Sequence, residues 1–284
     1  MAKNNKVILK NPYFRISAVI IIICFLITLG FFSFRYVFET MFSENPRFRL
    51  RNIIVQSSGY WNNRADDVMR ILELKKGVTN LFSINLYDLR KKLEDRRGDG
   101  IAFAEVSKEL PDTIKFEIVE RIPQAVLYSK KSGMVVDKDG VVMDSKYFKE
   151  VVDSMPVITG FKISENSKLK SDPYGQTLTN LKPALILISI INEDFNSMEL
   201  RVVNLYSPNK LFVFMVGPDH RVIKVTLPFE YSVDAPPSGI ELVESTKILK
   251  TKLEELKELL KYLKWKKTPF TEINMIYKDQ AVVK

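Results

Sequence analysis

The feature that most constrains this chain is an apolar run near its amino terminus. Residues Ile16 to Phe34 include no charged side chain, and Arg15 and Arg35 close the run at its two ends. About nineteen residues of α-helix, rising about 1.5 Å each, nearly cross a hydrocarbon core of about 30 Å. The run therefore predicts a membrane anchor over residues 16–34. The anchor side chains expected to meet lipid are Ile16, Ile20, Ile21, Ile22, Ile23, Phe25, Leu26, Leu29, Phe31 and Phe34.

A cleaved secretory signal is the alternative interpretation of this run, and the basic tail before it is typical of one. The run is longer than the usual apolar core of a signal, however. No small-residue cleavage site follows Phe34, where the sequence continues Arg-Tyr-Val-Phe-Glu-Thr-Met. A helix buried in a soluble protein is rarely apolar on every face. We therefore predict an anchor that is retained.

Charge alone does not orient the anchor. The tail, residues 1–15, carries basic side chains and no acidic one, but basic residues also follow the run, namely Arg35, Arg47, Arg49 and Arg51. The positive-inside rule is then close to a tie. Because the tail is too short to fold and a long domain translocates largely regardless of its charge, we expect the tail in the cytoplasm. Residues 35–49 are then a linker outside it.

Composition limits what the rest of the chain can be. Hydrophobic residues make up 46% of the chain and charged residues 27%, as in globular proteins. The single cysteine, Cys24, lies inside the anchor, so the external part has no disulfide. The formal net charge is +9, but the basic residues are interleaved with acidic ones. This charge favours neither nucleic acid nor an anionic membrane or cell wall.

Residues 50–121 predict a small α+β domain. The order is a strand at 50–55, helices at 65–74 and 84–94, and strands at 101–110 and 113–119. Asn63 and Ser83 are the expected helix caps, and Pro111-Asp112 is the expected turn between the last two strands. A sheet covered on one face by two helices would make this domain stable.

Residues 122–284 predict a mixed, mainly antiparallel β domain with two helices. A hairpin within 134–143, turning at Asp139-Gly140, is the strongest short-range strand signal. Helices are expected at 178–191, with Pro183 near the first turn, and at 240–264. Other strands are expected at 125–128, 155–160, 199–205, 211–216, 222–227 and 272–278. Residues 162–176 predict a surface loop, and the proline-containing stretch 228–239 has no clear interpretation.

Three strings of the sequence resemble one family. Residues 77–86 read GVTNLFSINL, residues 110–125 read LPDTIKFEIVERIPQA, and residues 136–142 read VDKDGVV. In order and spacing they are similar to passages of the bacterial cell-division proteins FtsQ and DivIB. Those proteins place a POTRA domain just outside a single amino-terminal anchor. The resemblance covers roughly residues 50–160, and the stretch 228–239 departs from the short glycine link that the family usually has there.

The resemblance implies a single-pass protein of the inner membrane at the division septum, with no catalytic site and no cofactor. FtsQ-like proteins bind the small anchored coiled-coil proteins FtsB and FtsL, partly by accepting a strand at a sheet edge. We therefore expect FtsB- and FtsL-like partners, with FtsK-like proteins and a septal wall synthase nearby. If strand 272–278 is an edge, it is the binding site. The residues expected to bind there are Ile273, Met275, Ile276, Tyr277 and Lys278.

The last helix allows two interpretations. Leucines follow a four-three spacing at Leu249, Leu253, Leu256, Leu260 and Leu263. This spacing suits the seam of a coiled coil with a partner, but the seam is short. A helix that packs on its own sheet shows the same stripe, and we favour that interpretation.

Catalytic and metal sites find little support in the sequence. The one histidine, His220, lies in a predicted turn, and with no external cysteine a zinc site would need mostly carboxylates. No phosphate-binding glycine motif occurs. Paired carboxylates, such as Glu117 and Glu120, leave a membrane-anchored cell-wall hydrolase as the alternative function. A POTRA-bearing outer-membrane assembly factor is a third interpretation, but no barrel strands follow the domain.

Overall fold

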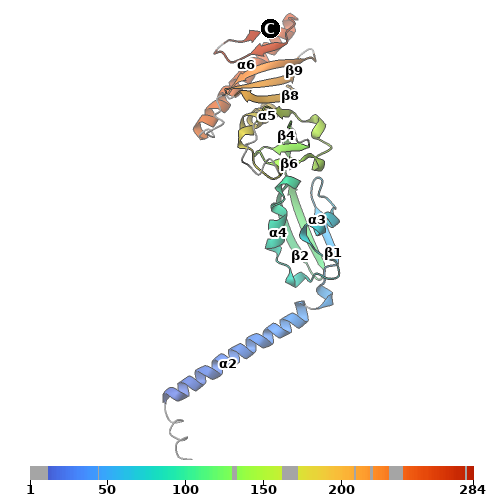
Figure 1. Cartoon of the computed structure of the whole chain (residues 1–284), viewed down its shortest axis with the longest axis vertical. Helices are drawn as coiled ribbons and strands as arrows, with labels where there is room; N and C mark the ends of the chain where they lie inside the picture. The colour runs from blue at the N-terminus through green and yellow to red at the C-terminus, as the bar shows by residue number, and fades with distance from the viewer. Residues whose placement is uncertain are drawn as a thin grey trace, which may run out of the picture. The chain divides into compact units, whose positions relative to one another are not determined.

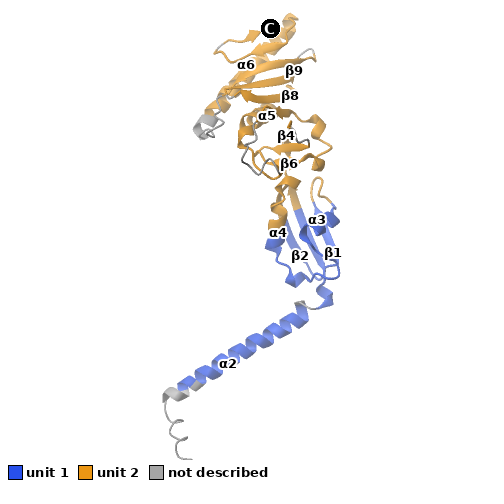
Figure 2. Cartoon of the chain, viewed as in Figure 1, with its two compact units in different colours: residues 1–56, 63–90, 105–117 blue, residues 57–62, 91–104, 118–284 orange. Residues whose placement is uncertain are grey.

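The computed structural model describes residues 12–43, 45–129, 133–161, 172–207, 209–217, 220–229, 239–278 and 280–284. The chain forms two compact units (Figure 2). One comprises residues 1–56, 63–90 and 105–117, and the other comprises residues 57–62, 91–104 and 118–284. The division crosses the predicted POTRA-like domain, so the bounds 50–121 and 122–284 stay predictions. Most of the tail, of loop 162–176 and of the stretch 228–239 lies outside the described residues.

A single long helix, α2 (Pro12–Phe38), contains the whole predicted anchor (Figure 1). A π-helical turn, η1 (Glu39–Ser43), continues it. Residues Val19–Phe42 are long and apolar enough to cross a membrane, and they are the one such span in the described part of the chain. The apolar side chains of α2 that the structure describes are all exposed, and among the described residues only the end of the helix, at Phe38, packs against another segment. Lipid is the environment that such a surface requires.

The first, three-stranded sheet has the predicted order of elements. Strand β1 (Asn52–Gln56) runs parallel to β3 (Thr113–Glu120), and β2 (Ile101–Glu109) lies on the other side of β3. Helices α3 (Ala65–Leu72) and α4 (Leu86–Glu94) fall between β1 and β2 in the chain. The apolar periodicity that predicted these elements also marks their buried side chains, which include Val55, Val68, Leu72, Ile114 and Phe116.

The predicted caps of both helices are wrong. Asn63 adopts a left-handed backbone, and Arg64 takes the cap position of α3, where its side chain makes no capping hydrogen bond. Ser83 instead ends a short 3₁₀ turn, η3 (Leu81–Ser83), so α4 begins later than predicted. Asn85 accepts a hydrogen bond from the Tyr87 amide at 3.0 Å and fills the cap role there.

The second sheet has nine strands and mixes parallel and antiparallel pairs. Its order is β12-β11-β10-β9-β8-β7-β4-β5-β6. The strands are β4 (Pro123–Leu127), β5 (Met134–Asp137), β6 (Val142–Asp144), β7 (Val157–Thr159), β8 (Leu200–Ser207), β9 (Lys210–Val216), β10 (Val222–Pro228), β11 (Glu272–Asn274) and β12 (Val282–Val283). The meander β8-β9-β10 and the hairpin β5-β6, with Gly140 at φ 82°, confirm the predicted α+β fold.

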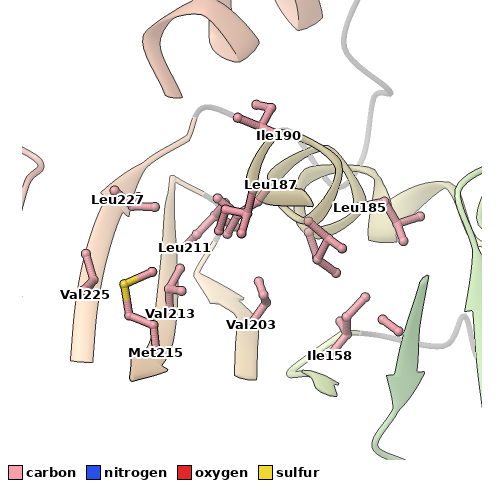
Figure 3. Close-up of a cluster of buried hydrophobic side chains, with 14 of the residues drawn as sticks. Ile158, Leu185, Leu187, Ile190, Val203, Leu211, Val213, Met215, Val225 and Leu227 are labelled. Atoms are coloured by element: carbon pink, nitrogen blue, oxygen red, sulfur yellow. The ribbon is translucent and has the colours of Figure 1, made fainter. Parts of the chain in front are cut away.

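Two helices supply the core of this sheet. On α5 (Lys182–Asp194), Leu187 points toward Leu211 of β9, whereas Ile190 lies on the opposite side of the helix (Figure 3). The leucine stripe of α6 (Gly239–Lys266) joins the same apolar cluster, and Leu249, Leu253 and Leu256 are fully buried. The stripe is therefore a core-facing surface and not a seam open to a partner.

One dipeptide at the end of β3 orders two loops of the second unit. The Glu120 carboxylate accepts hydrogen bonds from the Ser57 hydroxyl and from the amides of Tyr60 and Trp61. The neighbouring Arg121 donates from Nη1 to Asp137 Oδ2 at 2.6 Å. The other oxygen of Asp137 accepts from the amides of residues 139 and 141, which closes the β5-β6 turn.

We expect Asp137→Ala to lower the free energy of unfolding by about 3–5 kcal/mol, because it leaves the Arg121 guanidinium buried without its partner. The Asp137 side chain is only 4% exposed. Urea unfolding of the full chain in detergent, followed by tryptophan fluorescence, measures the change.

Asp139→Ala is the matched control for this prediction. Asp139 faces the same guanidinium at 3.9 Å, but its side chain is 63% exposed. Its loss should cost less than about 1 kcal/mol. If both variants lost the same free energy of unfolding, the conclusion that the buried Arg121–Asp137 pair stabilises the hairpin would be contradicted.

Candidate functional site

The candidate site is the carboxyl-terminal end of the nine-stranded sheet, where the sequence predicted an edge. Strand β11 pairs with β10 in parallel, with Val225 beside Ile273. It is not itself the edge, because β12 pairs with its other side in antiparallel register. Strand β12 is the last in the order, so among the described residues no strand lies beyond it.

The predicted strand 272–278 is shorter in the structure, and a local hydrogen bond explains why. The side-chain oxygen of Asn274 accepts from the Ile276 amide at 3.1 Å. This bond turns the chain out of the strand directly after Asn274. The residues that follow form the connection to β12, which the sequence analysis did not predict. The sequence does contain one indication of strand β12, namely the two β-branched valines of the segment Ala-Val-Val-Lys.

The hydrogen bonds of Lys284 define which way the edge strand faces. Its amide donates to the Glu272 carbonyl at 2.9 Å, and its carbonyl accepts from the Glu272 amide at 3.1 Å. Because successive residues of a strand point their backbone groups to opposite sides, the amide and carbonyl of Val283 point away from β11. These groups form the open edge of the sheet.

The five residues predicted to bind a partner separate into two sets. Ile273 and Met275 are buried in the core cluster of the sheet. Ile276 is half-buried, whereas Tyr277 is 54% exposed and Lys278 is exposed. Val282 on the edge strand is 41% exposed. The exposed residues of β12 and of the segment before it therefore include Tyr277, Lys278 and Val282, and the first two of these belong to the predicted set.

A buried lysine holds the connection between β11 and β12 in place. Lys252 of α6 is only 8% exposed. Its ammonium group donates to the Tyr277 carbonyl at 3.1 Å and pairs with Glu255 at 2.7 Å. Removing a lysine ammonium group from water costs free energy, so a lysine is buried only when its charge and its N–H donors find partners. The helical spacing puts Lys252 on the leucine face of α6, three residues after Leu249 and four before Leu256, but only the structure shows its partner, the Tyr277 carbonyl.

The other residues considered for chemistry have structural partners. Glu117 pairs with Lys115, and Glu120 accepts the three bonds that order loop 57–62. His220 is exposed in a turn, at φ 64°. Within the described residues no group of three or more histidine, cysteine or acidic side chains is placed to hold a metal ion.

Two pKa shifts outside the anchor also follow from structural contacts. Burial, reinforced by the nearby Asp99, raises the pKa of the Tyr147 phenol to about 12. The hydrogen bond to Asp194 raises the pKa of Lys250 on α6. Both groups therefore keep their usual protonated form at neutral pH.

Comparison with known proteins agrees with the resemblance found in the sequence. A sequence model of the FtsQ-type POTRA domain matches residues 48–121. A protein of Rickettsia bellii named cell division protein FtsQ is 31% identical over 93 residues, which cover 33% of this chain and 33% of that protein. A protein of the same name from Rickettsia felis is 25% identical over 127 residues, which cover 43% of this chain and 46% of that protein.

These matches confirm the predicted resemblance to FtsQ-type proteins, and the family model places it in the POTRA region. The matched regions span less than half the length of either curated relative.

We expect Lys252→Met to loosen the connection between β11 and β12 while the packing of α6 is kept. The Tyr277 carbonyl would lose a charge-assisted bond worth about 1.5–3 kcal/mol, so local amide exchange should accelerate by about tenfold or more. Hydrogen exchange of the Tyr277–Lys278 peptide, measured by mass spectrometry on the full chain, tests this. The exposed Lys261, on the same helix, provides the control Lys261→Met, which should leave that exchange unchanged.

Proposed function

We propose that this chain is a non-catalytic, membrane-anchored scaffold of the bacterial division machinery. In this proposal it recruits or regulates septal cell-wall synthesis by contacts with FtsB- and FtsL-like proteins. The open edge at β12 is the observation that carries the proposal, because unpaired strand groups bind an extended segment of another protein.

The anchor would strengthen partner binding by raising the effective concentration of the protein near other membrane proteins. A protein held in the membrane meets other anchored proteins at a much higher effective concentration than a free one, so weak contacts suffice. We propose that α2 spans the inner membrane at the septum, with residues 1–15 in the cytoplasm and the remainder outside. The anchor residues are those of the apolar run, from Ile16 to Phe34.

The partner would add a strand beside Val283 and lay its side chains on the neighbouring surface. Tyr277 and Lys278 offer an aromatic ring and a positive charge there, and Ile276 offers part of its side chain. Ile273 and Met275 then act by holding β11 in the core, so their role is to position the edge. FtsK-like proteins and the septal synthase are further partners in this proposal, at surfaces we do not assign.

We expect Val283→Pro to abolish binding of an FtsB-like partner. Proline removes the outward amide that a new strand would use, and it leaves the bonds of Lys284 to β11 intact. Titration of the full chain in detergent with FtsB- and FtsL-like proteins of the same organism measures the affinity.

Val283→Ala is the matched control, because it shortens the same side chain and keeps the amide. It should retain binding within a few fold. A proline variant that binds as well as the unmodified chain would overturn the edge as the binding site. Binding of neither protein by the unmodified chain would overturn the partners proposed here.

A further inference from the structure

The anchor and the loops that follow it are joined by an aromatic cluster in the first unit. Phe82 of η3 contacts three phenylalanines that follow the anchor: Phe38 at the end of α2, Phe42 in η1, and Phe48 in the turn η2 (Pro46–Phe48). Ring centroids lie 5.2 Å apart for Phe42 and Phe82, and 4.9 Å apart for Phe48 and Phe82. Such pairs contribute about 0.5–1.5 kcal/mol each beyond their buried area.

A buried asparagine fixes the same junction by hydrogen bonds. Asn80 is 8% exposed, and its amide nitrogen donates to the Phe42 carbonyl at 3.0 Å. Its side-chain oxygen accepts from the Phe82 amide at 2.8 Å. The carbonyl at the end of the anchor is thus bound by a residue of the folded part of the unit. The predicted linker 35–49 is therefore helix and ordered turn over most of its length, and not a free tether.

Two basic segments lie side by side next to this junction. The amide of Leu50 donates to the Thr79 carbonyl, and the amide of Gly77 donates to the Leu50 carbonyl. The backbones of Arg49 and Asn80 also form an isolated antiparallel β-bridge. Residues 47–51 and 75–80 are therefore neighbours. We call their exposed side chains the basic rim: Arg47, Arg49, Lys75, Lys76 and the apolar Val78, which is 70% exposed.

The length of the anchor places this rim near the membrane surface. If the hydrocarbon core contains residues 16–34, Phe42 lies eight residues beyond it, which is about 12 Å of helix. The headgroup layer is about 5–8 Å thick on each side. The rim adjoins Phe42 through Asn80, so it falls within about a Debye length, roughly 8–10 Å, of the headgroups.

We propose that the basic rim docks on anionic lipid headgroups, with Val78 entering the interface between them. Four exposed cationic side chains and one exposed valine, on two neighbouring segments, match a negatively charged surface with an apolar interior. A flexibly tethered domain would leave these charges free to turn away, but Asn80 and the phenylalanine cluster hold them at the anchor exit. The inference depends on α2 crossing the membrane and is independent of the proposed partner site.

The test uses the full chain in lipid nanodiscs. A Val78→Cys variant in a Cys24→Ser background carries an environment-sensitive fluorophore, and the discs contain a headgroup-linked quencher. Discs of phosphatidylcholine alone are compared with discs that also contain phosphatidylglycerol. We expect stronger quenching in the anionic discs. Adding Arg49→Gln, Lys75→Gln and Lys76→Gln should lower the ratio of docked to undocked protein about fivefold per residue.

The matched control removes the same number of charges from α6, by Lys261→Gln, Lys264→Gln and Lys266→Gln. These exposed lysines lie in the second unit, so the control should leave the quenching unchanged. Equal quenching in neutral and anionic discs would overturn the proposal. Equal effects of the rim and control variants would also overturn it, because net charge rather than the rim would then be responsible.

Discussion

Two loops of the second unit are ordered by two adjacent charges of opposite sign, Glu120 and Arg121. The carboxylate takes hydrogen bonds from loop 57–62, and the guanidinium neutralises Asp137, which in turn closes a hairpin. Each of these charges is costly to withdraw from water unless its partner is in place. The two loops are therefore ordered by the same dipeptide, and neither would keep its conformation on apolar packing alone.

Two of the strings that resemble FtsQ contain the residues of this arrangement. Glu120 and Arg121 belong to residues 110–125, and Asp137 belongs to residues 136–142. In the structure the two strings meet as an ion pair of 2.6 Å. The third string, residues 77–86, contains Asn80 and Phe82, which bind the anchor exit. Each string thus carries side chains that connect segments far apart in the chain.

The sequence predicted the order of helices and strands because apolar periodicity follows directly from which face is buried. The leucine stripe of α6 is an example, since its spacing alone already favoured a core-facing helix. Element ends were harder to predict. Ser83 looked like a cap and Asn85 was the cap, and the side chain of Asn274 stopped β11 early. Such short polar bonds leave the apolar pattern unchanged, so the pattern cannot reveal them.

At the candidate site, too, the apolar pattern of the sequence does not reveal which residues are covered by other elements or held by polar bonds. Ile273 and Met275 alternate with polar neighbours as an exposed strand would, yet both are core residues because β12 and α6 cover that end of the sheet. Lys252 binds the Tyr277 carbonyl, just as Asn80 binds the Phe42 carbonyl. In both places a buried polar side chain satisfies a backbone group that regular structure leaves open. The scaffold role proposed above would use surfaces and not a pocket, so the geometry of irregular segments would have to be fixed by such bonds. The two surfaces proposed here lie next to the two carbonyls that are held in this way.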